Sequence, residues 1–234
     1  MNEDFFSHCS YFRAPPHIEI GLRLFYWKKW QHYPTYSSSL PGYGDKQVAC
    51  SALEDIALPL HLLELSPSSI GHDREVMTSC FQVLTPHHLQ HLLGFRHTVG
   101  SVDLLYPPRS YLLACFQQLN NPKSKLTVGA RALCKHCIRC KSTWGEWDSN
   151  PALTNRLKGQ ETVQNEVALS TLLRLLEHAS WMNIHLLPHD VVVLKIRIES
   201  GFGCRWDLTQ GIFRGFVEPY MENGYEVGWV HNDS

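Results

Sequence analysis

The chain has 234 residues, of which 44% are hydrophobic, 11% aromatic and 18% charged. This composition supplies enough apolar side chains for one large core and excludes an intrinsically disordered chain. The formal net charge of −1 excludes a global positive field, so nucleic acid is not expected as a partner.

Two further features predict where the protein works. No uninterrupted apolar run approaches the roughly 20 residues that span a bilayer. The start, Met-Asn-Glu-Asp-Phe-Phe, lacks the basic and apolar regions of a secretory signal. We therefore expect no membrane association and a cytoplasmic or nuclear location.

Most of the chain has the spacing of amphipathic helices, interrupted by proline, glycine and asparagine. Pro15-Pro16 suits the start of the first helix, because proline at the first helical position loses no backbone hydrogen bond. Further helices are predicted over residues 45–65, 73–83, 86–93, 107–119 and 126–140. The clearest helix is 162–182, which has a broad stripe of leucine, valine and alanine.

The stretch from Val191 to His231 has the two-residue period of strands instead. Leu194 and Ile196 alternate with Lys195 and Arg197, which predicts one buried face and one face in water. Asn223-Gly224 suits a two-residue hairpin turn, since both positions tolerate positive φ. Four short antiparallel strands are therefore predicted in this stretch.

Helices first and strands last indicate an α+β fold in a single domain, 1–234. Residues 1–185 are predicted to form a mainly helical body, and residues 186–234 a C-terminal antiparallel β-meander. The meander is expected to pack on helix 162–182, because a few antiparallel strands need a covered face.

Three of the eight cysteines lie close together as Cys134, Cys137 and Cys140. Thiols spaced by three can converge on one metal ion, but a structural zinc site needs a fourth ligand. An iron–sulfur cluster is the other metal alternative, although the fourth cysteine and the proline of the ferredoxin run are missing. Reduced thiols without a metal are the remaining interpretation.

The same region is rich in basic residues, with Trp144 and Trp147 just after it. Basic side chains contact phosphates and tryptophans stack on bases, so nucleic-acid binding is one interpretation. A solvated helix face is the other, and the near-neutral net charge favours it. The basic residues are Lys123, Lys125, Arg131, Lys135, Arg139 and Lys141.

A second candidate site surrounds the predicted meander, because antiparallel strands can bring distant polar groups together. The candidate catalytic residues are His185, His189, Glu218 and His231. The candidate ligand-binding residues are Arg205, Trp206, Arg214 and Trp229. For the two tryptophans, packing in the core is the favoured alternative, since aromatic residues on strands chiefly pack.

No phosphate-binding loop, dinucleotide fingerprint, nucleophile elbow or zinc-protease motif occurs in the sequence. The main functional prediction is therefore a non-enzymatic protein-binding or scaffold module with a protein partner. One alternative is a zinc- or iron-binding protein that uses the three clustered cysteines. The other is a hydrolase-like enzyme with a His/Glu site beside the meander.

Overall fold

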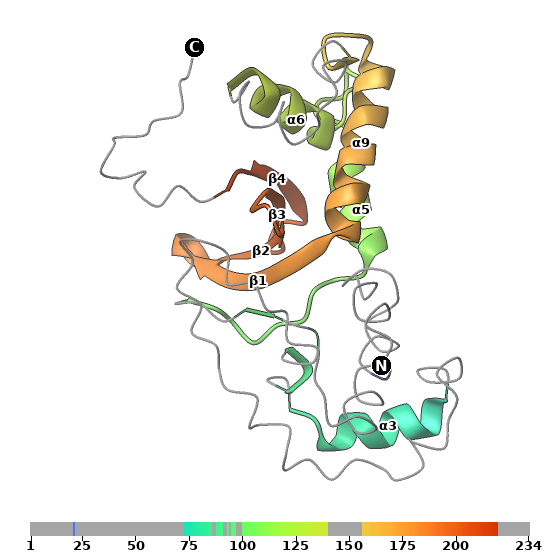
Figure 1. Cartoon of the computed structure of the whole chain (residues 1–234), viewed down its shortest axis with the longest axis vertical. Helices are drawn as coiled ribbons and strands as arrows, with labels where there is room; N and C mark the ends of the chain where they lie inside the picture. The colour runs from blue at the N-terminus through green and yellow to red at the C-terminus, as the bar shows by residue number, and fades with distance from the viewer. Residues whose placement is uncertain are drawn as a thin grey trace.

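The computed structural model describes residue 21 and residues 73–85, 88–90, 93, 95–96, 100–139 and 156–219. Helices precede strands along the chain (Figure 1), so the predicted α+β class is confirmed. The helices are α3 (Arg74–Val83), α5 (Arg109–Gln117), α6 (Val128–Arg139) and α9 (Glu161–Glu177). Of the helix predicted near residues 15–30 only Gly21 is described, and it is helical and buried; the helix predicted over 45–65 lies outside the described residues. Within the described part, no helix is long and apolar enough to cross a membrane.

The sheet is an antiparallel meander of four strands in the order β1-β2-β3-β4. Its strands are β1 (Ala179–Leu187), β2 (Val191–Ile198), β3 (Gly203–Asp207) and β4 (Ile212–Val217). A short 3-10 turn, Pro188–Asp190, joins the first two strands. The strand predicted to end near His231 and the Asn223-Gly224 turn lie outside the described residues.

The first strand, β1, was not predicted from the sequence. Two predicted boundaries are therefore wrong: the end of helix 162–182 and the start of the meander. The predicted helix 162–182 ends at Glu177, and the predicted meander start at 186 moves back to Ala179. Trp181, Met182 and Ile184 are each at most 1% exposed, so both faces of β1 are covered. A strand that is buried on both faces shows no apolar–polar alternation, which explains the error.

The outer edge of β1 is covered by upstream residues 95–96 and 100–102. The Arg96 N–H donates to the Met182 carbonyl at 2.7 Å, and the Val102 N–H donates to the Ile184 carbonyl at 3.0 Å. Ser101 also forms an isolated antiparallel bridge with His185. These bonds pair backbone groups that a bare edge strand would leave available for aggregation.

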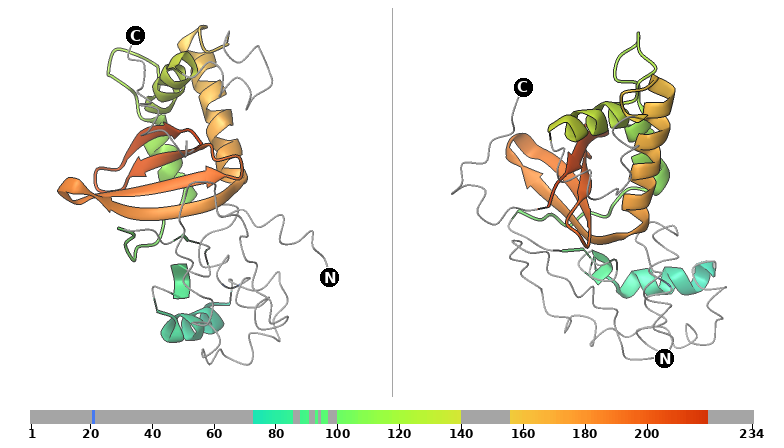
Figure 2. Two further views of the ribbon diagram at one scale, coloured as in Figure 1. Left: turned by 60° about the vertical axis from the view of Figure 1, so that its left-hand side comes forward. Right: turned by 45° about the horizontal axis from the view of Figure 1, so that its top comes forward.

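One face of the sheet packs against α5, α6 and α9 and forms the core; the left view of Figure 2 shows the sheet in front of α5. Trp206 is fully buried there, and its indole N–H donates to the Leu112 carbonyl in α5 at 3.1 Å. The Phe116 and Phe213 rings meet edge to face at 4.8 Å between centroids. The inward side chains of the strands are Met182, Ile184, Leu194, Ile196, Cys204, Trp206, Phe213 and Phe216.

Gly129 allows α6 to approach α5 closely. A Cβ at this position would lie 2.1 Å from the Phe116 ring. Glycine lowers helix propensity, yet here the missing side chain makes room for a core aromatic residue.

The face of β2 predicted to lie in water is only partly exposed. Arg197 is 5% exposed, and its guanidinium donates to the carbonyls of Gly201 and Glu218. Arg197 therefore ties the β2–β3 turn to the residue after β4, where the sequence alone predicted a solvated charge.

Candidate functional site

The sheet face opposite the helices gathers positively charged side chains. Because side chains alternate along strands, Asn183, Lys195 and Arg205 form one row across β1, β2 and β3 on this face. Arg214 is the extra residue of a bulge in β4, opposite the Arg205–Trp206 step. His185 lies two residues from Asn183 on the same face. We call His185, Lys195, Arg205 and Arg214 the outer-face cluster.

The pKa of His185 shows that the three cations of the cluster act on its imidazole electrostatically. Burial, as the largest cause, and the positive charges of Lys195, Arg205 and Arg214 together lower the pKa of His185 from 6.5 to about 4. The imidazole is therefore neutral at pH 7 and is surrounded by three cations from three strands.

Asn183 contacts His185 directly. Its Oδ1 lies 3.0 Å from His185 Nδ1. Its Nδ2 donates to the Arg96 carbonyl at 2.6 Å and to Ser101 Oγ at 2.7 Å. Asn183 is 1% exposed, so these bonds replace the water that a surface amide would have.

Arg214 is held at the surface by a buried carboxylate. Its Nη1 lies 3.7 Å from Asp207 Oδ2, and the other oxygen of Asp207 accepts the backbone N–H of Gln210 at 2.9 Å. The side chain of Arg214 is 34% exposed, whereas that of Asp207 is 4% exposed. Asp207 thus anchors the guanidinium while leaving part of it accessible to a ligand.

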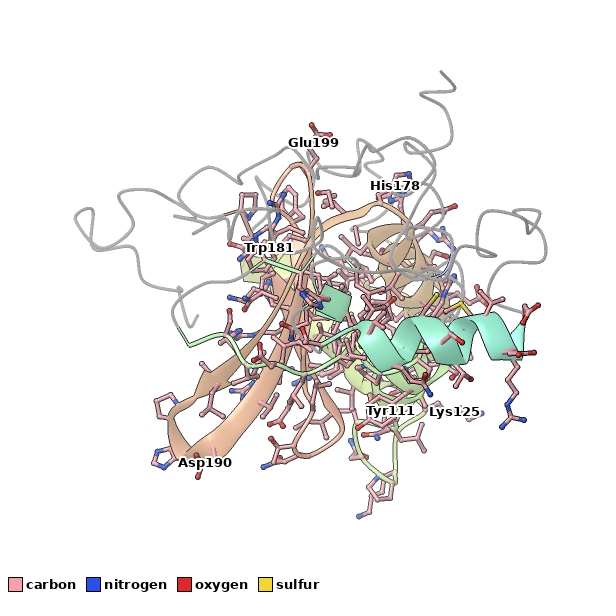
Figure 3. All side chains as sticks on the ribbon, turned by 90° about the horizontal axis from the view of Figure 1, so that it is seen from below. Tyr111, Lys125, His178, Trp181, Asp190 and Glu199 are labelled. Atoms are coloured by element: carbon pink, nitrogen blue, oxygen red, sulfur yellow. The ribbon has the colours of Figure 1, made fainter. Side chains whose placement is uncertain are left out.

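The other predicted residues of the meander do not join this cluster. His189 is exposed in the β1–β2 turn with φ 67, next to Asp190, which Figure 3 labels at the hairpin tip. Trp206 lies in the core, which was the favoured alternative for it. Trp229 and His231 lie outside the described residues.

Glu218 lies elsewhere on the sheet and pairs with α6. Its Oε1 is 3.2 Å from His136 Nδ1. Val217, the residue before it, is level in register with Trp181, four residues from His185. That offset is about 13 Å along the strands, and three strand spacings of about 4.8 Å separate β1 from β4. The structure therefore does not bring Glu218 to His185.

The three clustered cysteines are only partly described. Cys134 Sγ lies 3.6 Å from the Leu157 carbonyl oxygen and 3.6 Å from Gln164 Oε1, and burial raises the pKa of its thiol. The side chains of Cys137 and Cys140 lie outside the described residues. Within the described part, no group of three His, Cys, Asp or Glu side chains could hold a metal ion. Zinc binding stays a prediction, which the zinc content of the purified protein and of Cys137→Ser would test.

The predicted basic region is exposed where the structure describes it. Lys123 and Lys125 lie in the loop before α6, and Arg131 and Lys135 lie on α6 itself. The side chain of Arg139 and residues Lys141, Trp144 and Trp147 lie outside the described residues.

Two residues of this face, Lys195 and Asn183, are not among the site residues predicted from the sequence. Lys195 was recognised only as part of an alternating strand, because alternation does not reveal which neighbours a charge will meet. Asn183 gave no signal, since it follows the predicted end of helix 162–182 without any motif. The sequence signal that could have revealed the cluster is the presence of Lys195, Arg205 and Arg214 on three successive strands.

Residues 117–218 match a family model described as the CdiA C-terminal tRNase toxin domain. Comparisons with curated proteins and with solved structures give no match. The matched residues cover less than half of the chain and include α6, α9, all four strands and the outer-face cluster.

This match overturns two predictions. A non-enzymatic protein-binding scaffold is the wrong description, because the matched family consists of domains that cleave tRNA. The expectation that nucleic acid is not a partner is wrong for the same reason. The net charge of the whole chain hides a local excess, since basic residues outnumber acidic ones within 117–218 although the whole chain is nearly neutral. The match favours the alternative of an enzyme beside the meander: residues 117–218 are similar to tRNA-cleaving toxin domains.

Proposed function

We propose that this chain is a tRNA-cleaving ribonuclease whose reaction centre is the outer-face cluster. The family match supports the activity. One observation carries the location: a neutral histidine, His185, is surrounded by three cations on one sheet face inside the matched residues. Because the substrate is tRNA, we place the action of the protein in a cytoplasm.

In this proposal His185 is the general base. Its neutral imidazole takes the proton of a ribose 2′-hydroxyl, and the 2′ oxygen forms a bond to the adjacent phosphorus. The bond from phosphorus to the 5′ oxygen breaks, and that oxygen takes a proton from water. The products are a 2′,3′-cyclic phosphate and a 5′-hydroxyl. A positioned base typically contributes a factor of about 10² to 10⁴ in rate.

Lys195, Arg205 and Arg214 stabilise the charge that develops on the phosphoryl oxygens. Cations fixed before the reaction are effective because they need no reorganisation when charge appears. A guanidinium also binds two phosphate oxygens at once, which orients the phosphorus for attack. A bound phosphate offsets the three positive charges, so it raises the pKa of His185 at the stage when the imidazole must accept a proton.

The test uses the purified full chain with total tRNA. The His185→Ala variant should cleave about 10² to 10⁴ times more slowly than the unchanged protein. His178→Gln is the matched control, because His178 is exposed at the end of α9, where Figure 3 labels it, and should cleave normally. The 5′ ends of the products should accept a label from a kinase without prior phosphatase treatment.

Two results would contradict the proposal. One is the absence of tRNA cleavage by the unchanged protein under any of the salt and pH conditions tested. The other is a His185→Ala variant that cleaves as fast as the unchanged protein while melting at the same temperature.

A further inference from the structure

We propose that Asn183 is a positioning residue that holds His185 in the tautomer with hydrogen on Nδ1, and that Ser101 and the Arg96 carbonyl fix Asn183 for this role. The inference rests on the proposed function, because it assigns a task within that reaction centre. It adds residues upstream of the family match to the site, since both supports precede residue 117.

The orientation of the Asn183 amide follows from its partners. One partner, the Arg96 carbonyl at 2.6 Å, is a backbone oxygen and can only accept a hydrogen bond. The amide nitrogen must therefore face Arg96, and its second N–H reaches Ser101 Oγ at 2.7 Å. Both amide hydrogens are used, which leaves Oδ1 directed at His185.

The orientation of the amide then decides the tautomer of His185. Asn183 Oδ1 can only accept, and it lies 3.0 Å from His185 Nδ1. Nδ1 must carry the hydrogen of the neutral ring, so Nε2 has the lone pair. A general base needs such a lone pair on the nitrogen that meets the substrate.

The supports of Asn183 are fixed by backbone hydrogen bonds rather than by side-chain packing alone. The Val102 N–H donates to the Ile184 carbonyl at 3.0 Å, and the Leu186 N–H donates to the Gly100 carbonyl at 2.9 Å. Ser101 lies between these two bonds and is bridged to His185. Its hydroxyl is thereby held beside β1, which is what a positioning role requires.

The charged groups around His185 explain why an amide suits this position. Lys195 of β2, Arg205 of β3 and Arg214 of β4 all disfavour the imidazolium. The buried carboxylate of Asp207 lies in the cross-strand row of His185 and pairs with Arg214. A carboxylate in place of Asn183 would stabilise the imidazolium directly, so Asn183→Asp should raise the pKa of His185.

The first measurement is nitrogen NMR of the histidine rings in the full chain at pH 7. We expect His185 to show a protonated Nδ1 and an unprotonated Nε2. A protonated Nε2 in the unchanged protein would overturn the inference, whatever the enzymatic activity. The measurement needs no turnover, so it is independent of the proposed function.

The second measurement is the pH dependence of tRNA cleavage. Asn183→Asp should move the acid limb of kcat/KM upward by about 1 to 3 pH units. Ser101→Ala should lower kcat several-fold with KM within twofold, and should weaken the Nδ1 tautomer signal. A merely structural role for Asn183 would leave the acid limb in place and would lower activity only through lost folded protein.

Folding of each variant is followed by circular dichroism, because Asn183 is buried. If Asn183→Asp does not fold, Ser101→Ala and the tautomer of the unchanged protein decide the question. A Ser101→Ala variant with unchanged kcat and an unchanged tautomer would overturn the role of the upstream segment. Failure of the unchanged protein to cleave tRNA would reject the proposed function and leave the tautomer result standing.

Discussion

At the scale of single residues, His185 links the charge of the outer face to the stability of the fold. Its pKa is about 4 in the folded chain, against 6.5 for an ordinary histidine. Between these two values the unfolded chain binds the proton more readily than the folded chain does. Above pH 6.5 the ring is neutral in both states, and its titration does not reduce the unfolding free energy. As the pH falls from 6.5 toward 4, the unfolded chain gains a proton that the folded chain does not, so the unfolding free energy decreases.

This difference predicts how the protein responds to acid. The unfolding free energy should fall by on the order of 1 to 2 kcal/mol more in the unchanged protein than in His185→Gln between pH 7 and pH 4.5, after allowing for solvent screening. Urea unfolding of both proteins at several pH values measures this. Parallel curves for the two proteins would show that His185 titrates normally in the folded state.

Gly203 occupies a position in β3 at which a side chain would have no room. A Cβ at Gly203 would lie 1.9 Å from the Ile196 carbonyl oxygen and 2.9 Å from Arg197 Cα. Since both are backbone atoms of the paired strand, Gly203→Ala should destabilise the protein by about 2 kcal/mol or more.

Thermal melting of Gly203→Ala against the unchanged protein checks this expectation. Ser200→Ala is the control, because Ser200 is exposed in the turn before Gly203 and should change stability by no more than about 0.5 kcal/mol. Equal melting temperatures for the two variants would mean that β2 and β3 can separate at Gly203 without cost.

At the scale of elements, α6 combines a buried face with an exposed basic face. Leu133 and Ala130 are fully buried, whereas Arg131 and Lys135 are exposed. The two cations lie four residues apart on the helix, so they share one side of it. Under the proposed function, this pair would contact tRNA phosphates that lie away from the reacting bond, because α6 packs on the sheet face opposite the outer-face cluster.

The double variant Arg131→Gln/Lys135→Gln should therefore bind tRNA more weakly while cleaving normally at saturation. The slope of log affinity against log salt should become shallower by about 1 to 2, one for each lost phosphate contact. Arg214→Gln is the comparison, since the proposed mechanism places Arg214 at the reacting phosphate, so that its loss should lower kcat. An unchanged salt slope would place the tRNA contacts outside α6.

The elements also show where periodicity succeeded. The predicted helices 73–83 and 126–140 lie within one or two residues of α3 and α6, because one face of each helix packs and the other does not. Periodicity did not predict β1, because residues on both of its faces, such as Trp181 and Met182, are buried. A sequence period appears only where the two faces of an element differ in exposure, and the two faces of β1 differ little.

At the scale of the whole molecule, the fold begins upstream of the family match. Leu112 and Phe116 of α5 are at most 1% exposed in the shared core, and residues 95–96 and 100–102 cover the edge of β1. Both segments lie upstream of the match, apart from Gln117, the last residue of α5. The matched region alone would expose part of the core and a bare strand edge.

A protein consisting of residues 117–218 should therefore fail to melt cooperatively and should aggregate. A protein that begins at residue 95 and ends at 219 should regain much of the cooperativity, because it restores α5 and the covering segment. Circular dichroism melts and gel filtration of the two proteins measure this. Cooperative melting of 117–218 at the temperature of the full chain would show that the upstream segments are dispensable.

The sequence by itself determined the fold class. Helical periods followed by a two-residue period indicate an α+β fold, since exposure patterns are local properties of a chain. It also singled out His185, Arg205 and Arg214, because polar residues next to strands are natural candidates for a site. Only the tertiary structure decided that Lys195 completes the cluster, that Glu218 pairs with α6 instead, and that Asn183 connects His185 to Ser101. Each of these outcomes depends on strand register, which is set by pairing between segments far apart in the chain and leaves no local trace in the sequence.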